Sequence, residues 1–265
     1  MSGPVGSAFH RCRPLVAPLV AAWATLAGCS PPGPETVTVS AASDLRFAFQ
    51  ELGARFREET DLPVTFNFGS TGHLAQQIQQ GAPVDVFAAA DTEYVEGLVA
   101  QGHIIPGSVA LYGIGYLVLW TREDGTMKAE RLEDLLQPGV ERVSIANPAH
   151  APYGAAAAAA LRSASLWDEV QGKLVLGESV NQAFQFAQTG NVDVGIVALS
   201  LAMVGEGGRY ARIPEELHPP IHQAMGVVSS TRNEAGARAF VEFVNGPVGR
   251  PIMERYGFTL PETSP

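Results

Sequence analysis

Strand-like and helix-like segments alternate along the first half of this chain. Three short apolar runs have the length and the β-branched and aromatic content of strands: residues 37–39, 64–68 and 83–87. The segment after the first run carries Leu45, Phe49 and Phe56 at helical spacing, and helix-like segments also follow the other two runs. This order is typical of βαβ units, so we expect an α/β fold in which helices cover both faces of a parallel sheet.

The pattern changes at residues 111–120, which are all aliphatic, aromatic or glycine. This run is longer than an ordinary strand, so we expect it to pass from one lobe to a second, with Gly113 and Gly115 at the bend. A second set of alternating segments follows, and residues 222–229 have the composition to cross back. The prediction is two lobes that enclose a cleft: residues 36–111 with 223–265, and residues 112–222.

The N-terminus has the composition of a secretory signal. Basic residues precede an apolar run at 15–27 that is too short to span a bilayer as a mature helix. The run ends in Leu-Ala-Gly followed by Cys29, which resembles a bacterial lipobox, where the cysteine is lipidated and becomes the first residue. We expect residues 1–28 to be removed and residues 29–35 to tether the chain to a membrane, outside the cytoplasm. Ordinary signal cleavage nearby, with Cys29 as a bystander, is the alternative.

Cysteine content and net charge restrict the partners of the chain. Cys12 lies in the segment to be removed and Cys29 would carry the lipid, so neither a disulfide nor a Cys/His zinc site is expected. Removing residues 1–28 lowers the number of Lys and Arg from 17 to 15 and leaves 27 Asp and Glu, a net charge of −12. Nucleic acid is therefore not an expected partner. A small anion is compatible with this charge, because backbone dipoles bind anions locally.

Four short turns of small or polar residues each follow a strand-like run and precede a helix-like segment. They lie at residues 41–44, 68–72, 152–154 and 179–181. A helix N-terminus presents N–H groups without intrahelical partners and the positive end of the helix dipole, both of which favour an anion. In open α/β sheets, ligands bind beyond the carboxyl ends of the strands, where such turns gather. The sequence therefore predicts an anion site in the cleft; the alternative is that the turns only cap helices.

With these turns in this order, the mature chain from Thr36 to Leu260 resembles the substrate-binding proteins of molybdate ABC transporters. The resemblance rests on short segments that are specific only together: residues 41–45, 69–72, 74, 76–78, 81–87, 90–91, 152–154, 195–197 and 255–258. It implies an α/β protein with the two-lobed periplasmic-binding-protein fold of type II, in which two parallel-rich sheets with helices on both faces are joined by a hinge. It also implies a periplasmic location and a monomer.

Members of this family hold molybdate or tungstate between the lobes and deliver it to a membrane permease and its ATPase. Carried over to this sequence, the site consists of six residues: Ser43, Asp44, Ser70, Thr71, Tyr153 and Val180, the last through its backbone N–H. The resemblance implies no enzyme activity, no cofactor and no direct protein ligand to molybdenum, which enters only as the oxyanion. Hydroxyl and N–H donors suit a receptor, because several modest bonds can be separated when a hinge opens.

Two positions depart from the family pattern and bear on the choice of ligand. Asp44 stands where many relatives have serine or asparagine, and Ala198 stands where some have a tyrosine. A carboxylate aimed at a dianion would repel it, so we expect Asp44 to turn away and cap the helix at 45–59 while its backbone N–H faces the ligand. Alternatively, Asp44 accepts a proton from the ligand, which would favour a protonated oxyanion such as phosphate over molybdate. Sulfate is a further candidate.

Two other function classes stay open from the residues alone. An extracytoplasmic enzyme with Ser70 or Thr71 as nucleophile would need a base, and the sequence places none beside them. A sensory domain of the same fold would usually carry a helix-turn-helix segment, whereas this chain has a signal at that end. The histidines form no metal-binding motif, and His73 is expected to be an exposed residue in the first turn of its helix.

Overall fold

The computed structural model describes residue 3 and residues 36–125 and 127–260. The predicted signal, Cys29 and the tether lie outside the described residues, apart from Gly3. The chain forms two units, Met1–Gly33 and Pro34–Pro265, and the two sheets belong to the second. None of the helices in the described residues is long and apolar enough to cross a membrane.

A five-stranded sheet forms the first lobe, with the strand order β2-β1-β3-β10-β4. Its strands are β1 (Val37–Ala42), β2 (Val64–Gly69), β3 (Val86–Ala89), β4 (Ala110–Gly115) and β10 (Ile221–Val227). Strand β1 pairs in parallel with both β2 and β3, whereas β10 pairs antiparallel with β3 and β4. Four strands therefore run in one direction and β10 runs against them, so the expected parallel sheet is a mixed one.

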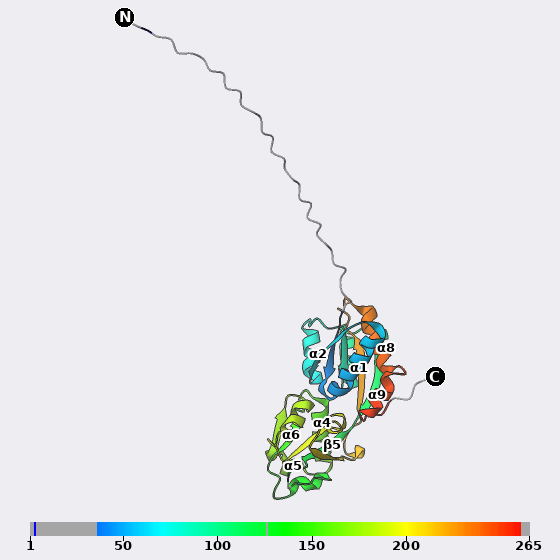
Figure 1. Cartoon of the computed structure of the whole chain (residues 1–265). Coiled ribbons are helices and arrows are strands. Elements are labelled where there is room, and N and C mark those ends of the chain that lie inside the picture. The colour runs from blue at the N-terminus through cyan, green and yellow to red at the C-terminus, as the bar shows by residue number, and fades with distance from the viewer. Residues whose placement is uncertain (1–2, 4–35, 126, 261–265) are drawn as a thin grey trace. The chain divides into compact units, whose positions relative to one another are not determined.

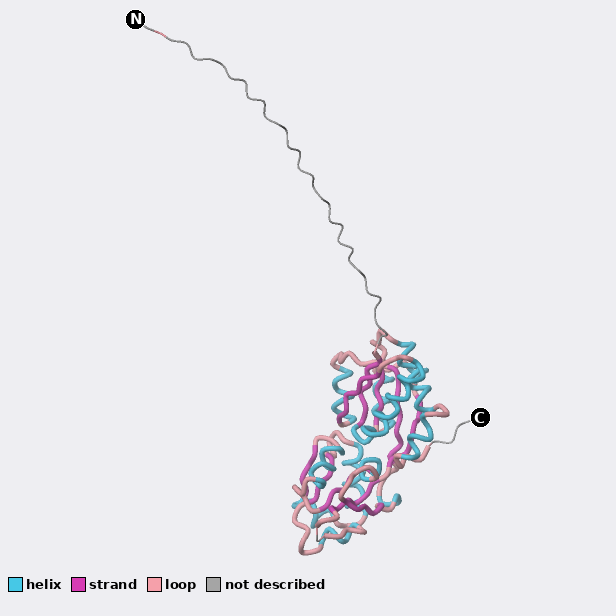
Figure 2. Tube along the Cα trace, viewed as in Figure 1, coloured by secondary structure: helices cyan, strands magenta, loops and turns pink. Residues whose placement is uncertain are grey.

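The second sheet repeats this arrangement with the order β7-β6-β8-β5-β9. Its strands are β5 (Leu117–Arg122), β6 (Val143–Ala146), β7 (Leu174–Gly177), β8 (Val194–Ala198) and β9 (Gly208–Arg212). Here β6 pairs in parallel with β7 and β8, and β5 is antiparallel to β8 and β9. In each sheet, the opposing strand is the one that enters it after a crossing between the lobes. Figures 1 and 2 show both sheets with their helices.

The longer helices lie where the apolar periodicity predicts them. They are α1 (Arg46–Thr60), α2 (Thr71–Gln79), α3 (Thr92–Ala100), α4 (Pro152–Ser163), α6 (Val180–Gln188) and α8 (Glu234–Asn245). The structure adds short elements that the sequence pattern did not reveal: β9, α5 (Trp167–Val170), α7 (Leu199–Ala202), α9 (Gly249–Arg255), and the 3-10 turns η1 (Ser43–Leu45), η2 (Pro106–Ser108), η4 (Gln171–Lys173) and η5 (Glu215–Leu217). Residues 132–136, whose leucines also have a helix-like spacing, form a 3-10 turn, η3 (Leu132–Leu136). Elements of one or two turns are too short to establish a helical period.

Aromatic side chains tie α1 and α8 to the first sheet. Phe49 and Phe56 on α1 are completely buried, and their rings lie 5.8 and 5.4 Å from the ring of Phe240 on α8. Tyr112 on β4 packs against Phe49, with 6.0 Å between the ring centroids. Aromatic pairs at such distances add about 0.5–1.5 kcal/mol each beyond the burial of their area. Helix α8 therefore packs with α1 on the first sheet, although it follows the second sheet's strands along the chain.

The chain passes from the first sheet to the second at Tyr116, which separates β4 from β5, and returns before β10. These are the two expected crossings, while the lobe boundaries at 111/112 and 222/223 stay predictions. Neither Gly113 nor Gly115 has a positive φ, so the bend does not depend on the conformational freedom of glycine. Gly115 is required for space instead, because a Cβ there would lie 2.0 Å from the hydroxyl oxygen of Tyr153.

Candidate functional site

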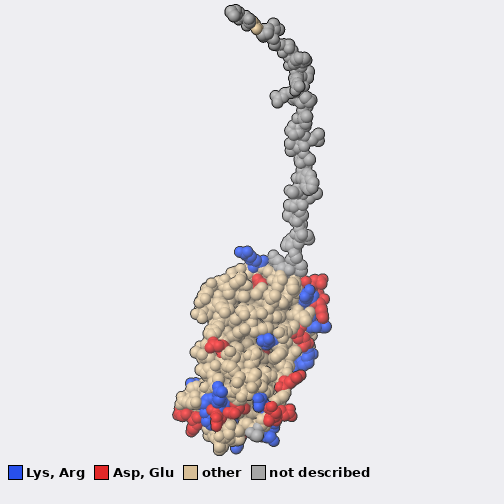
Figure 3. Space-filling model, turned by 60° about the vertical axis from the view of Figure 1, so that its left-hand side comes forward, with Lys and Arg blue, Asp and Glu red and all other residues tan. Residues whose placement is uncertain are grey.

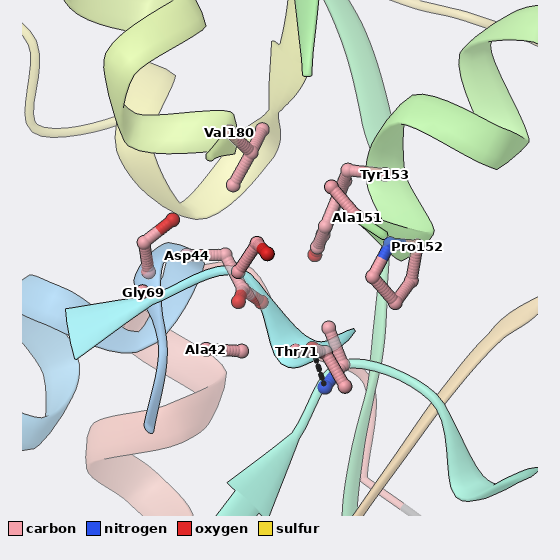
Figure 4. A pocket seen from close by; sticks show the side chains of 11 residues that line it. Ala42, Asp44, Gly69, Thr71, Ala151, Pro152, Tyr153 and Val180 are labelled. Atoms are coloured by element: carbon pink, nitrogen blue, oxygen red, sulfur yellow. Dashed lines mark hydrogen bonds between the residues drawn. The ribbon is translucent and has the colours of Figure 1, made fainter. Parts of the chain in front are cut away.

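The four small or polar turns meet around a small cavity between the two sheets. The empty space there is about 190 Å³, which includes space open to solvent. The lining residues are Ala42, Ser43, Asp44, Gly69, Ser70, Thr71, Ala90, Ala151, Pro152, Tyr153 and Val180. All six residues that the sequence predicts for the site are among them. Figure 4 shows Tyr153 and Val180 extending from the second lobe toward Asp44.

Two hydroxyl groups of the first lobe each accept a hydrogen bond from a backbone N–H. Ser43 Oγ accepts a hydrogen bond from the backbone N–H of Asn181 at 3.2 Å. Thr71 Oγ1 accepts one from the N–H of Ala90 at 3.1 Å, the bond drawn in Figure 4. A hydroxyl that accepts a bond still has its own hydrogen to donate. Both side chains can therefore donate a hydrogen bond to a ligand in the cavity.

Three helices begin at the cavity. Thr71 and Val180 are the first residues of α2 and α6, and Tyr153 is the second residue of α4. The caps of α2 and α6, Ser70 and Ser179, accept from the N–H of the third helical residue in each case. The first N–H of each helix has no intrahelical acceptor and lies at the positive end of the helix dipole. Capping and anion binding are thus compatible here, because they use different N–H groups.

Among the described residues that line the cavity, Asp44 carries the only ionisable acid or base other than a tyrosine hydroxyl. Lys and Arg side chains lie on the outer surface instead, and on the face shown in Figure 3 they are interspersed with Asp and Glu. The donors around the cavity are therefore hydroxyl and backbone N–H groups. Such a set binds an anion by hydrogen bonds and dipoles rather than by opposite charge.

A buried hydrogen-bond network holds Asp44. Its Oδ2 accepts from Gln223 Nε2 at 2.8 Å, and the same Gln223 nitrogen donates to the hydroxyl oxygen of Tyr153 at 3.0 Å. Gln223 Oε1 in turn accepts from the hydroxyl of Tyr112 at 2.8 Å. Asp44 Oδ1 has no hydrogen-bond partner among the described residues. Burial raises the pKa of Asp44 to about 6, and the hydrogen bonds from Gln223 and Tyr153 oppose this rise.

The expectation that Asp44 caps the following helix is wrong. Neither η1 nor α1 has a side-chain cap; the Asp44 carboxyl instead accepts a hydrogen bond from Gln223, and Asp44 is among the residues that line the cavity. The reason is the 3-10 turn Ser43–Leu45, which separates β1 from α1 and places Asp44 before the α-helical start. Its backbone carbonyl is held by the hydroxyl of Ser200 at 2.8 Å, which ties this turn to the second lobe.

Sequence reasoning missed Gln223 and Tyr112, which belong to the buried hydrogen-bond network of Asp44 and Tyr153. Both side chains are fully buried, and burial raises the pKa of the Tyr112 and Tyr153 hydroxyls well above the ordinary value, as does the nearby Asp44. Both hydroxyls therefore stay protonated and remain hydrogen-bond donors. A glutamine within the apolar strand β10 was the available signal, because buried polar groups are nearly always hydrogen-bonded.

The structure places a histidine beside Ser70, where the sequence indicated no base. Ser70 Oγ lies 2.7 Å from His150 Nδ1, although the two residues are 80 positions apart. Burial lowers the pKa of His150, as does the charge of His73, while Glu178 raises it. His150 Nε2 is 3.7 Å from a Glu178 oxygen, too long for a hydrogen bond, so no third group orients the ring as in a catalytic triad.

Known proteins resemble this chain over most of its length. Residues 37–259 match the model of a family described as bacterial extracellular solute-binding protein. The Molybdate-binding protein ModA of Rhodobacter capsulatus is 36% identical over 84% of this chain and 87% of its own length. YvgL of Bacillus subtilis has the name "Putative ABC transporter substrate-binding lipoprotein". It is 31% identical over 84% of this chain and 86% of its own length.

A solved structure agrees with these sequence relatives. The periplasmic molybdate-binding protein of Azotobacter vinelandii superposes with a TM-score of 0.80 at 32% identity, covering 85% of this chain and all of that chain. Its fold is the two-lobed periplasmic-binding-protein fold that the turns and crossings indicate here. This chain therefore belongs to the family of bacterial extracellular solute-binding proteins.

Proposed function

We propose that this protein is the extracytoplasmic receptor of a molybdate ABC transporter. It holds molybdate, or the similarly shaped tungstate, in the cavity between the lobes. The hydroxyls of Ser43, Ser70 and Thr71 donate to the oxyanion, together with the backbone N–H of Val180. The single O–H of Tyr153 donates to it as well, after turning away from Asp44. The observation that carries the proposal is the convergence of these neutral donors, from both lobes, on one cavity. The molybdate-binding names of the relatives favour the same ligand.

The donor set also suits release. Hydrogen bonds to a charged group contribute about 1.5–3 kcal/mol each, so several of them together can offset the dehydration of a dianion. Because they come from two lobes, opening the hinge removes part of the set and weakens the rest. The anion then passes to the permease and its ATPase. In this role the protein acts as a monomer, has no catalytic residue, and needs no cofactor.

Isothermal titration calorimetry on the purified mature protein tests the ligand. Molybdate and tungstate are expected to bind one per chain, with sulfate and phosphate weaker by tenfold or more, a difference of at least about 1.4 kcal/mol. Phosphate binding without molybdate binding would instead indicate that Asp44 accepts a ligand proton. Sulfate is the matched control for that case, because at neutral pH it is a tetrahedral dianion without a proton to donate.

We also propose that Cys29 carries a lipid that anchors the mature chain to a membrane. The lipobox-like sequence before Cys29 and the lipoprotein name of YvgL support this. Replacing Cys29→Ser is expected to move the protein from the membrane fraction to the soluble fraction of the cell envelope, while molybdate affinity stays unchanged. Membrane retention of the Cys29→Ser variant would contradict the anchor, and Cys12→Ser serves as the control for loss of a thiol.

A further inference from the structure

Three potential metal ligands meet beside the cavity. Glu178 Oε2 lies 3.9 Å from His73 Nδ1 and 3.7 Å from His150 Nε2. The two imidazole rings are stacked, with 3.8 Å between centroids and an interplanar angle of 21°. One ligand atom from each of the three residues lies within 4.8 Å of the other two. The sequence alone gave no sign of this cluster, because its members are far apart along the chain.

The three residues come from both lobes. His73 is on α2 of the first lobe, whereas His150 precedes α4 and Glu178 precedes α6 in the second. The lobes are in close contact at this point, because the Gly72 N–H donates to the His150 carbonyl at 2.9 Å. A Cβ on Gly72 would lie 2.8 Å from that carbonyl oxygen, so glycine permits the approach. The cluster therefore exists only while the two lobes are together.

Both nitrogen-to-carboxylate distances exceed the hydrogen-bond limit, and they are ion-pair distances only when the histidines are protonated. A bound cation would hold the three groups together when the histidines are neutral. Two imidazole nitrogens and one carboxylate are a common ligand set for Zn²⁺, with bonds of about 2.0–2.2 Å to nitrogen and oxygen. Tetrahedral ligands at that bond length are roughly 3.3 Å apart. The two nitrogen-to-carboxylate distances must therefore shorten by about half an ångström, and the nitrogen-to-nitrogen distance, which is within 4.8 Å, by up to about 1.5 Å.

Ser70 prepares His150 for this role. Its Oγ lies 2.7 Å from His150 Nδ1, and a hydrogen bond donated by Nδ1–H leaves the lone pair on Nε2, the atom that faces Glu178. Histidines that bind metals usually donate their second ring N–H to such a partner, which fixes the tautomer. His73 is less constrained, with 46% of its side chain exposed. Its ring must turn out of the stack to direct Nδ1 at the ion, and its exposure allows that rotation.

We propose that His73 Nδ1, His150 Nε2 and a carboxylate oxygen of Glu178 form a binding site for Zn²⁺ or a similar divalent transition-metal ion, which bridges the two lobes. A water molecule completes the tetrahedral coordination. The ion favours the closed arrangement of the lobes, because its full ligand set exists only there. It also places positive charge next to Ser70, so zinc and an oxyanion in the cavity strengthen each other's binding by the same factor.

Calorimetric titration of the chelator-treated mature protein with zinc chloride alone tests the site, without any oxyanion. At pH 7.5 we expect one zinc ion per chain. His73→Ala and Glu178→Gln are each expected to weaken this binding at least tenfold, because each removes a ligand but neither lines the anion cavity. His222→Ala is the matched control, since His222 is an exposed histidine on β10 outside the cluster, and its zinc binding is expected to equal that of the unmodified protein.

Absence of stoichiometric zinc binding would overturn the site, as would zinc binding that is unchanged in both His73→Ala and Glu178→Gln. Zinc binding is also expected to weaken at pH 5.5, because histidine must be deprotonated to bind a metal. The titration is independent of the proposed transport function, so failure of molybdate to bind leaves this result interpretable. If molybdate binds, its affinity is expected to be higher in zinc than in chelator, and equal affinities would overturn the bridging of the lobes.

Discussion

Replacing Asp44→Asn is expected to stabilise the folded protein at pH 7, by at most about 3 kcal/mol. Burial raises the pKa of Asp44 from 3.8 to about 6, so the folded state disfavours the ionised carboxyl. The contribution of this carboxyl to the free energy of unfolding is fully present below pH 3.8 and is lost as the pH rises through about 6. The loss amounts to about 1.36 kcal/mol for each unit of pKa difference between the folded and unfolded states. Asparagine does not ionise, and its amide keeps an oxygen for the hydrogen bond from Gln223.

The same substitution is expected to strengthen molybdate binding at neutral pH. Asp44 Oδ1 has no partner among the described residues, and an ionised carboxyl at the cavity repels a dianion. Wild-type affinity is therefore expected to fall as the pH rises above about 6, by up to tenfold per unit, because binding requires the protonated acid. In Asp44→Asn this dependence disappears, because an amide does not ionise.

Thermal unfolding and calorimetry between pH 5.5 and 8 measure both effects of Asp44→Asn. The upper limit of about 3 kcal/mol corresponds to an increase of roughly 6–12 °C in Tm for a chain of this size. Glu206→Gln is the matched control, because it removes the same charge at an exposed position and is expected to change neither the Tm nor the pH profile. A wild-type affinity that stays constant from pH 5.5 to 8 would contradict the role assigned to Asp44.

Replacing Thr71→Val is expected to weaken molybdate binding by about tenfold to a hundredfold. Valine has nearly the shape of threonine but lacks the hydroxyl, so the anion loses a donor worth about 1.5–3 kcal/mol. The N–H of Ala90, which now donates to Thr71 Oγ1, also loses its acceptor inside the protein. A buried N–H without a partner costs about 1–3 kcal/mol, so the variant is expected to unfold at a lower temperature as well.

Thr71→Ser separates these two effects from a simple change of packing. Serine keeps the hydroxyl for both Ala90 and the ligand, so affinity is expected to stay within a few-fold of the wild type. Binding measured well below the Tm of each variant distinguishes lost contacts from unfolding. Unchanged affinity in Thr71→Val, together with a lower Tm, would show that Thr71 serves only to hold the Ala90 N–H.

Local chemistry made much of this fold and site predictable. Strand and helix periods follow from which residues face the core, and these placed the main helices and most strands within a few positions. The hydroxyl oxygen of a serine at a helix start can accept a hydrogen bond from a backbone N–H of the first helical turn, so Ser70 was recognisable as a cap from its neighbours alone. The short elements α5, α7 and β9 were missed, because their formation depends on tertiary packing more than on a repeating pattern.

The direction of the Asp44 side chain was not predictable in this way. A cap and a buried acid are equally compatible with the local sequence, and the difference is made by Gln223, which is 179 positions away. The contact between Ser70 and His150 was likewise not predictable from the local sequence, and neither was the cluster of His73, His150 and Glu178. Each of these contacts joins segments that meet only when the chain has crossed between the sheets.

The sequence by itself determined the alternating elements, the two crossings, the turns that begin helices at the cavity, and the excess of negative charge that rules out an electrostatic attraction for anions at long range. These properties depend on neighbours within a few residues or on composition. Only the tertiary structure decided which side chains face one another across the lobes, because burial sets the ionisation of Asp44 and lobe contact brings His150 to Ser70. Desolvation and long-range hydrogen bonding arise from packing, and no local pattern encodes them.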